Sequence, residues 1–240
     1  MRIFVMDKYT GLCLCLLCAL LLAVPVLWYQ SEPVSASVAA CPVSVAETDT
    51  PVYSVTFNIS GDGSILPVLL ATLEARHCDA VFFAATDWAK SHPELLHKIA
   101  ASGHTVGGFI EAPRDADEKA LLSLIEQTDQ ALTDIIGISP VFFRCAEAAP
   151  DSVFASVCYQ SGRIPIGKAT DSLDWRNFSA EQVSFRLCDR MQNGAILQFQ
   201  TDTLATSSFD TILSALASIG YAPVSLKTLF PPNDAKVFSE

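Results

Sequence analysis

The feature that most constrains the fold is an alternation, from residue 51 onward, of short apolar runs with longer segments of helical spacing. Strands that are buried on both faces read as continuous apolar runs, which is typical of a parallel sheet covered by helices. We therefore predict an α/β fold with a parallel sheet. The expected strands are Val52–Phe57, Ala80–Ala85, His104–Phe109, Val141–Phe143, Ile164–Ile166, Ala195–Phe199 and Pro223–Leu226.

The segments between these runs carry apolar residues at helical spacing. Two of them begin with a capping-box pattern, Ser91 followed by Glu94 and Ser179 followed by Gln182. The spacing leaves open a doubly wound sheet and a closed β/α barrel. Neither GxGxxG nor GxxxxGK[ST] follows the first expected strand, so the signal of a nucleotide-binding fold is missing. The expected helices are 65–76, 93–102, 120–136, 152–160, 180–191 and 209–219.

The first 30 residues differ from the rest, because no charged side chain occurs between Tyr9 and Trp28. About 20 apolar residues span a bilayer as a helix. Arg2 and Lys8 precede the run, which favours a cytoplasmic N-terminus and an exported remainder. We predict a membrane anchor in 1–30, with a cleaved signal peptide as the alternative. The expected location is the cell membrane, crossed once with the domain outside the cytoplasm, or secretion after cleavage.

The remaining chain divides by composition into three parts. Residues 31–50 are rich in Ser, Val, Ala, Pro and Thr and are expected to form an extended stalk. The folded domain is expected over 51–230 and a tail over 231–240. The formal net charge is -11, and such an acidic surface repels phosphates, so we expect no nucleic-acid partner.

Cysteine spacing gives no metal-binding pattern. The chain has 8 cysteines, and the three in the apolar run leave five outside it, an odd number that cannot all pair within one chain. No CxxC spacing occurs among the five, so a thiolate zinc site is not expected. Their disulfide pairing stays open at this point. The five are Cys41, Cys78, Cys145, Cys158 and Cys188.

A series of motifs in the domain resembles a known family in order and spacing. The series comprises VTFNISGD at 55–62, DAVFF at 79–83, WAKSHPELLHKI at 88–99, GHTVG at 103–107, FFR at 142–144, DSLDW at 171–175, GAIL at 194–197 and GY at 220–221. It is similar to the NodB-homology polysaccharide deacetylases, carbohydrate esterase family 4, and nearest to their spore-associated branch. The resemblance implies a distorted (β/α)7-type barrel with its site at the carboxyl ends of the strands.

The resemblance also implies a chemistry, the metal-assisted hydrolysis of an N-acetyl group. In the family, one Asp and two His hold a divalent ion that polarises the carbonyl and activates a water molecule. A second Asp takes the proton of the water, and a further His protonates the leaving amine.

At those positions the present chain carries other residues. The base position falls on Asn58, whose amide accepts no proton near neutral pH. The metal-binding Asp falls on Ile59, the two His ligands on Phe109 and Pro113, and the acid on Gln200. All 4 histidines precede residue 105, so the later strands have none to offer.

Three supporting residues of the family pattern are retained, Arg144, Asp174 and Trp175. The resemblance implies that Arg144 orients the base position, that Asp174 pairs with Arg144, and that Trp175 lines the acetyl pocket. A purely structural role for the three is the alternative, because a buried Arg–Asp pair is costly to break.

The hypothesis that follows is a catalytically inactive deacetylase-like domain that binds a cell-envelope glycan or an envelope protein and needs no cofactor. One alternative is an active hydrolase of N-acetyl groups in cell-wall polysaccharide, with a divalent, zinc-like ion held by substitutes such as Asp62 and Glu111, or Glu147 and Asp171. Another is a structural scaffold in envelope or spore assembly.

Overall fold

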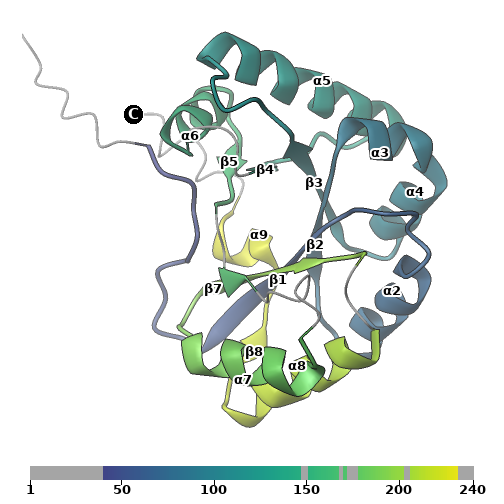
Figure 1. Ribbon diagram of the computed structural model, residues 1–240, viewed down its shortest axis with the longest axis vertical. Helices are drawn as coiled ribbons and strands as arrows, with labels where there is room; N and C mark the ends of the chain where they lie inside the picture. The colour runs from purple at the N-terminus through teal and green to yellow at the C-terminus, as the bar shows by residue number, and fades with distance from the viewer. Residues whose placement is uncertain (1–39, 147–150, 168–169, 172–177, 203–205, 232–240) are drawn as a thin grey trace, which may run out of the picture. The chain divides into compact units, whose positions relative to one another are not determined.

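A computed structural model describes residues 40–146, 151–167, 170–171, 178–202 and 206–231. Parallel strands form a curled sheet at the centre, and helices lie along its outer side (Figure 1). The predicted α/β fold with a parallel sheet is confirmed. The membrane segment expected in 1–30 lies outside the described residues. Within the described part of the chain, no helix has the length and apolar character needed to cross a bilayer.

The sheet has eight strands in the order β5-β4-β3-β2-β1-β7-β6, with β8 paired to the start of β1. Most expected strands lie within one or two residues of the observed ones. The last is shorter than expected, because Leu226 opens a helix, and β6 was not expected at all. The strands are β1 (Val52–Asn58), β2 (Ala80–Ala84), β3 (Thr105–Ile110), β4 (Phe142–Cys145), β5 (Ile164–Pro165), β6 (Thr170–Asp171), β7 (Ala195–Gln200) and β8 (Ala222–Pro223).

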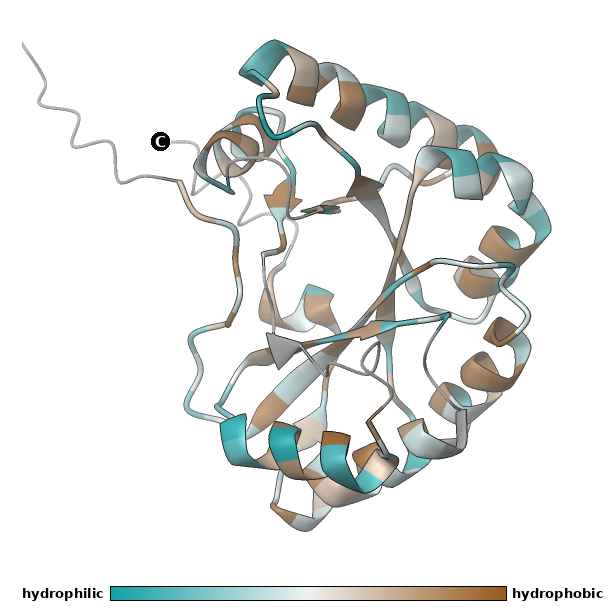
Figure 2. Ribbon diagram, viewed as in Figure 1, coloured by the Kyte–Doolittle hydropathy of each residue, from teal (hydrophilic) through white to brown (hydrophobic). Residues whose placement is uncertain are grey.

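The helices turn their apolar sides towards the sheet and their polar sides outward (Figure 2). Six of them follow the sequence prediction, whereas α3 and α9 are short helices that were not expected. The helices are α2 (Leu66–Ala75), α3 (Thr86–Ser91), α4 (Pro93–Ala101), α5 (Glu118–Ile136), α6 (Asp151–Gln160), α7 (Ala180–Arg190), α8 (Thr206–Ser218) and α9 (Leu226–Leu229).

One of the two predicted capping boxes is present and the other is not. The backbone N–H of Gln182 donates to the hydroxyl of Ser179 at 3.3 Å, and the Gln182 side chain accepts from the backbone N–H of Ser179 at 2.9 Å. The prediction for Ser91 was wrong. Ser91 ends α3, and its hydroxyl donates to the Asp87 carbonyl at 2.8 Å, so His92 becomes the N-cap of α4 without a side-chain bond.

Strand β1 separates apolar from polar side chains by alternation, since successive residues of a strand point to opposite faces. Tyr53, Val55 and Phe57 pack in the core cluster that contains the apolar residues of α2 and α8. Thr56 and Asn58 point to the opposite face, which the curled sheet encloses. The sheet therefore has an apolar outer face and, along β1, a polar inner face.

Much of the interior of the curled sheet is filled by a second apolar cluster. Phe83 and Phe142 belong to it, together with Ile196 of β7 and with Leu226 and Phe230 at the end of the chain. Val224, just after β8, accepts a hydrogen bond from the hydroxyl of Ser54 at 2.8 Å, which ties this end of the chain to the beginning of β1. The polar inner side chains of β1 are thus left at the carboxyl ends of the strands.

The segment before β1 packs on the domain. The backbone N–H of Val43 donates to Pro165 at 2.8 Å, and that of Ala46 donates to Gly194 at 2.9 Å. Isolated bridges join Val43 to Ile166 and Val45 to Ala195, and Ala46 is 4% exposed. The stalk expected over 31–50 therefore does not extend to residue 50, because from about residue 40 the chain is held by the sheet.

Of the five cysteines outside the N-terminal run, Cys78, Cys158 and Cys188 are free thiols in the structure. Cys78 and Cys158 are buried. Burial raises the pKa of the Cys78 thiol to about 12 and raises that of Cys158 as well. Because the thiolate is the reactive form, both groups are inert fillers of the core.

Candidate functional site

The positions singled out by the sequence meet at the carboxyl edge of the sheet. Asn58, the last residue of β1, lies opposite Gln200 of β7 on one side and opposite Phe83 of β2 on the other. Phe109 of β3 lies opposite Arg144 of β4. Parallel strands place loop-borne sites at this edge, so the fold brings the predicted base and acid positions, the ligand position Phe109 and the supporting residue Arg144 to one end of the sheet.

Arg144 connects the two sides of this edge. One guanidinium nitrogen donates to the amide oxygen of Asn58 at 2.9 Å, and another donates to the hydroxyl of Thr56 at 3.0 Å. The Thr56 hydroxyl in turn donates to the Leu197 carbonyl of β7 at 2.7 Å. The guanidinium also lies over the Phe83 ring, 4.3 Å from its centroid. Hydrogen bonds and a cation–π contact thus fix Arg144, which is 3% exposed.

The partner of Arg144 at the base position is an amide, and this changes the chemistry of the site. An amide oxygen accepts hydrogen bonds but takes up no proton near neutral pH. The expected geometry is kept, since Arg144 still reaches the last residue of β1. The general base that this geometry would orient is absent at Asn58.

The metal expected from the resemblance does not fit the residues at its ligand positions. Ile59 is 6% exposed and packs in the apolar cluster beneath the helices. Phe109 is half-buried against the cluster that contains Phe83. Pro113 is exposed, and its carbonyl accepts the N–H of Ala116 in a turn at 3.1 Å. Divalent ions take oxygen, nitrogen or sulfur ligands, and these three side chains carry carbon only.

The substitute ligands weighed from the sequence are not gathered into a metal site. Asp62 is exposed, and its carboxylate accepts the backbone N–H of Ser64 at 3.0 Å, which lowers the pKa of Asp62. Glu111 is also exposed and lines a cavity of which Asp62 is no part. Among the described residues, no three His, Cys, Asp or Glu side chains come close enough to hold a metal ion. Glu147, Asp174, Trp175 and the side chain of Asp171 lie outside the described part.

Two threonines that sequence reasoning missed shape this edge. Thr56 holds Arg144, as described above. Thr201, just after β7, accepts the backbone N–H of Ser60 at 2.9 Å and donates to the Ser60 carbonyl at 3.1 Å. These bonds fix the loop that follows Asn58. The sequence did contain a hint of the role of Thr56, because it is a polar residue in a buried strand, two positions before Asn58. No local sequence feature indicates a role for Thr201.

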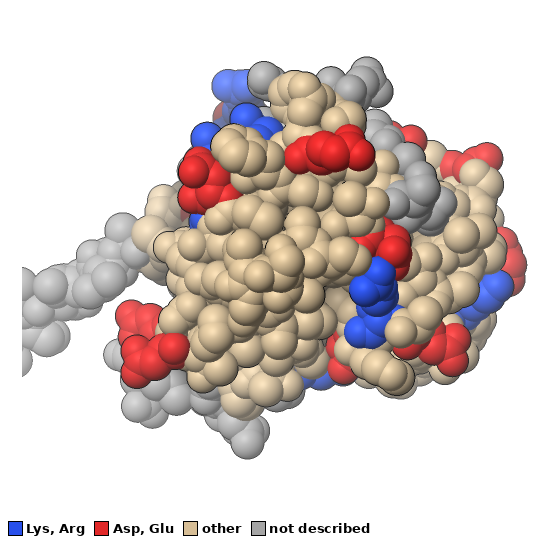
Figure 3. Space-filling view, turned by 90° about the horizontal axis from the view of Figure 1, so that it is seen from below, with Lys and Arg blue, Asp and Glu red and all other residues tan. Residues whose placement is uncertain are grey.

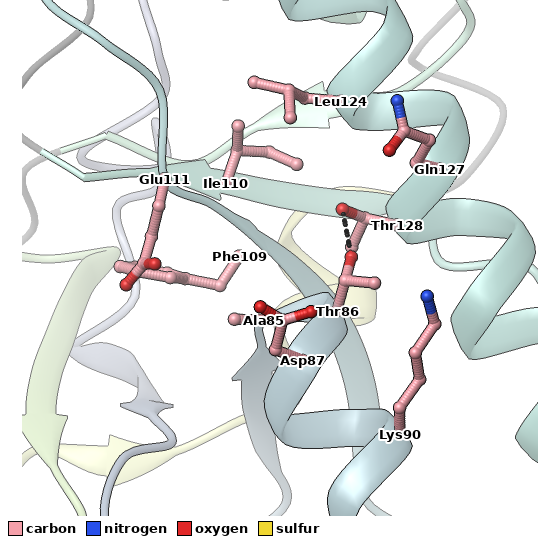
Figure 4. Close-up of a pocket in the computed structure, with 10 residues that line it drawn as sticks. All are labelled: Ala85, Thr86, Asp87, Lys90, Phe109, Ile110, Glu111, Leu124, Gln127 and Thr128. Carbon is pink, nitrogen blue, oxygen red and sulfur yellow. Dashed lines mark hydrogen bonds between the residues drawn. The ribbon is translucent and has the colours of Figure 1, made fainter.

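A cavity of about 240 Å³ lies beside this edge, between α3, β3 and α5 (Figure 4). Its wall combines charged, hydroxyl and apolar side chains, and the hydroxyls of Thr86 and Thr128 are hydrogen-bonded to each other at 2.9 Å. Phe109 reaches the cavity, but Asn58, Arg144, Pro113 and Gln200 do not line it. The lining residues are Ala85, Thr86, Asp87, Lys90, Phe109, Ile110, Glu111, Leu124, Gln127 and Thr128.

Comparison with known sequences agrees with the resemblance read from the motifs. Residues 46–163 match the model of the polysaccharide deacetylase family. The chain is 23% identical to the uncharacterized protein YlxY of Bacillus subtilis over 185 residues, 75% of this chain and 58% of that protein. It is 27% identical to the peptidoglycan-N-acetylglucosamine deacetylase PgdA of Listeria monocytogenes over 181 residues. That match covers 74% of this chain and 38% of the relative, so the chain spans only part of the length of these relatives.

Solved structures share the fold. A carbohydrate esterase family 4 pseudoenzyme from Bacillus anthracis superposes with a TM-score of 0.73 at 18% identity, over 79% of this chain and 69% of that one. A family 4 carbohydrate esterase from Streptomyces lividans superposes with a TM-score of 0.66 at 22% identity, over 77% of this chain and 95% of that one. The predicted barrel type is thereby confirmed. Motif order, family model and fold agree, and the chain carries a domain of the polysaccharide deacetylase (NodB-homology) family.

Proposed function

We propose that this domain has lost hydrolysis and binds an N-acetylated envelope glycan without cleaving it. The observation that carries the proposal is the contact between Arg144 and Asn58, in which the guanidinium holds an amide where the family holds the catalytic carboxylate. Carbon-only side chains at Ile59, Phe109 and Pro113 support the same conclusion from the ligand side.

The sizes of the rate contributions that the replaced groups would make favour loss of activity. General acid–base catalysis contributes about 10²–10⁴-fold per group, and both Asn58 and Gln200 replace such groups. Metal polarisation of the carbonyl adds several kcal/mol of transition-state stabilisation, and its three ligand positions are replaced as well. Five changes around one centre remove the reaction rather than only slow it.

A binding role is supported by the part of the site that is retained around Arg144. Arg144 is kept in place by Thr56, Asn58 and Phe83, so the inner frame of the site persists without its reacting groups. The relatives named peptidoglycan-N-acetylglucosamine deacetylase act on an N-acetylated envelope glycan, and the Bacillus anthracis structure is described as a pseudoenzyme. We extend both descriptions to this chain as a proposal, with Trp175 and Asp174 as further contacts.

The location is part of the same proposal. The uncharged run from Tyr9 to Trp28 would hold the domain on the outer side of the membrane, where the glycan lies.

Zinc binding and acetate release by the purified full chain test the loss of activity. We expect neither stoichiometric zinc binding nor release of acetate from N-acetylglucosamine oligomers. The matched comparison is a rebuilt chain carrying Asn58→Asp, Ile59→Asp, Phe109→His, Pro113→His and Gln200→His, in which we expect zinc affinity to appear. A mutant of the Bacillus anthracis pseudoenzyme has restored activity, so such a gain has a precedent. Zinc binding together with acetate release by the unchanged chain would refute the proposal.

Glycan affinity tests the binding role separately. We expect Trp175→Ala to weaken retention of the full chain on peptidoglycan or on immobilised N-acetylglucosamine oligomers by about tenfold, since aromatic contacts dominate binding surfaces. Phe185→Ala is the control, because Phe185 is an exposed aromatic residue of α7 with 75% exposure. An equal effect of the two changes, or no binding by the unchanged chain, would favour a scaffold role instead.

A further inference from the structure

The cavity between α3, β3 and α5 is separate from the centre around Arg144. Its wall includes Thr86 and Asp87 of α3 and Thr128 of α5, together with Glu111 just after β3. Of the positions on which the proposed loss of hydrolysis rests, Phe109 lines the cavity, whereas Asn58, Ile59, Pro113 and Gln200 do not. A ligand in this cavity would therefore contact Phe109 but not the hydrogen-bonded pair of Arg144 and Asn58.

Charged groups of both signs line the cavity, with an excess of carboxylates. Asp87 and Glu111 contribute two negative charges and Lys90 one positive charge. Figure 4 shows Glu111 at one end and Lys90 with Gln127 towards the other, while Asp87 lies between them. None of the three charged groups takes part in the ion pairs found among the described residues. The arrangement favours a ligand that carries a positive charge, which the carboxylates would attract.

A hydroxyl pair lies in the wall of the cavity. Thr128 is 3% exposed, and its hydroxyl and that of Thr86 share one hydrogen bond of 2.9 Å. Two hydroxyls carry two hydrogens, and this bond uses one of them. The described residues show no acceptor for the second. This hydrogen, together with the ammonium of Lys90, offers donors to oxygen atoms of a ligand.

The size and the apolar part of the wall limit the ligand. A cavity of about 150 Å³ takes one benzene ring, so one of about 240 Å³ takes a ring or a short chain with several substituents. Ala85, Ile110 and Leu124 form the apolar part, against which carbon atoms pack. The combination of carboxylates, donors and apolar wall is typical of a pocket for a small polar molecule.

We propose that this cavity binds a small molecule with one ammonium group and several oxygen atoms. The ammonium group lies against Asp87 and Glu111, and the oxygen atoms accept from Lys90 and from the Thr86–Thr128 pair. Two sources share this chemistry, an amino sugar with a free amine and a zwitterionic amino acid. The experiment below separates them.

Binding to the full chain is measured by calorimetry with four probes: glucosamine, alanine, N-acetylglucosamine and glucose. Glucosamine or alanine is expected to bind, and whichever binds more tightly identifies the source. N-acetylglucosamine and glucose lack the ammonium group and are expected to bind at least about fivefold more weakly. Equal affinity for glucose and glucosamine, or no probe with a Kd below about 10 mM, overturns the proposal.

Single substitutions of the lining residues test whether the ligand binds in this cavity. Asp87→Asn and Glu111→Gln keep the shape of each side chain and remove its charge, and each is expected to weaken binding about two- to fivefold. Thr128→Val removes the buried hydroxyl and should also weaken binding, whereas Thr128→Ser restores it. Glu126→Gln is the matched control, because Glu126 is an exposed carboxylate of α5 that does not line the cavity. Binding that is unchanged in the Asp87 and Glu111 variants places the ligand elsewhere and refutes the site.

Discussion

At the scale of single residues, Arg144 shows how a buried cation is held by neutral partners. A buried cation costs free energy unless it is hydrogen-bonded. Asn58 and Thr56 supply oxygen atoms at 2.9 and 3.0 Å, and the Phe83 ring supplies a negative face. These contacts give two guanidinium nitrogens of Arg144 oxygen partners without a carboxylate at position 58.

We expect Arg144→Met to lower the free energy of unfolding by about 2–3 kcal/mol, because the buried oxygen atoms of Asn58 and Thr56 lose their donor. Urea denaturation of the full chain measures the change. Arg163→Met is the control, since Arg163 pairs with Asp129 at 2.9 Å in an ion pair at the surface whose side chains are 22% and 25% exposed. Such a pair contributes about 0.2–1 kcal/mol. Equal losses in the two variants would contradict the role given to Arg144.

His104 is a second residue whose burial should have a measurable effect on stability. It is 8% exposed, packs against the Phe82 ring at 5.5 Å, and has no partner for either ring nitrogen among the described residues. Burial lowers the pKa of His104, and the charge of Asp79 opposes this in part. The folded chain therefore disfavours the imidazolium form.

The sign of the pH effect follows from this lowered pKa. As the pH falls below about 6.5, the unfolded chain binds a proton that folded His104 does not bind, so stability decreases. We expect the free energy of unfolding to decrease between pH 7.5 and 5.5 by more in the unchanged chain than in His104→Leu. Denaturation at the two pH values measures the difference. A pH dependence that is identical in both proteins would show that His104 contributes nothing.

At the scale of elements, the region between β2 and α4 shows where local sequence signals mislead. Ser91, Pro93 and Glu94 form a good capping box in sequence. The chain instead makes a separate helix, α3, whose last residue is Ser91. Trp88 of this helix donates from its indole to the Gly61 carbonyl at 2.9 Å and stacks on His92. Tertiary contacts thus decide the helix boundary in this region.

The two serines give a paired prediction. Ser179→Ala removes the hydroxyl that accepts the backbone N–H of Gln182 in the capping box of α7 and should cost about 1 kcal/mol of stability. Ser91→Ala removes only a bond to the Asp87 carbonyl within α3 and should cost clearly less. Thermal unfolding of the two variants measures both. A larger cost at Ser91 would mean that it caps α4 after all.

At the scale of the whole molecule, the domain includes a segment that its composition assigned to a stalk. Val43 and Val45 bridge to the sheet, and Ala46 is buried against Gly194. The carbonyl of Ala46 would clash with any side chain at position 194, which explains the glycine there. Figure 3 shows another property at this scale, with uncharged side chains over most of the face in view and both acidic and basic groups among them. The absence of a nucleic-acid partner stays a prediction.

Two truncations test the boundary. Removing residues 1–39 should leave the free energy of unfolding of the domain unchanged, whereas removing residues 1–50 should lower it by about 2 kcal/mol. The longer truncation loses the backbone bonds of Val43 and Ala46 and the burial of Ala46. Chemical denaturation compares the two. Equal stability would restore the stalk as first expected.

The sequence was sufficient for the strands and for the family, for a physical reason. Buried parallel strands must be apolar, so β1, β2, β3 and β7 are visible as runs, and the family motifs stand at the strand ends where chemistry is placed. The replacements at Asn58, Phe109 and Gln200 were equally visible, because an amide that takes up no proton near neutral pH and a phenyl ring that offers no metal ligand are recognised from residue identity alone.

The sequence did not contain what depends on residues far apart in the chain. The bond between Thr201 and Ser60 joins positions separated by 141 residues, and the cavity wall combines α3, β3 and α5. Periodicity and spacing are local, so they determined that this protein is a parallel α/β domain with a deacetylase-like motif order and altered reacting groups. The tertiary structure alone decided that Arg144 is hydrogen-bonded to Asn58 and Thr56, that the segment from residue 40 belongs to the domain, and that a charged cavity lies between α3, β3 and α5. Long-range packing brings those groups together.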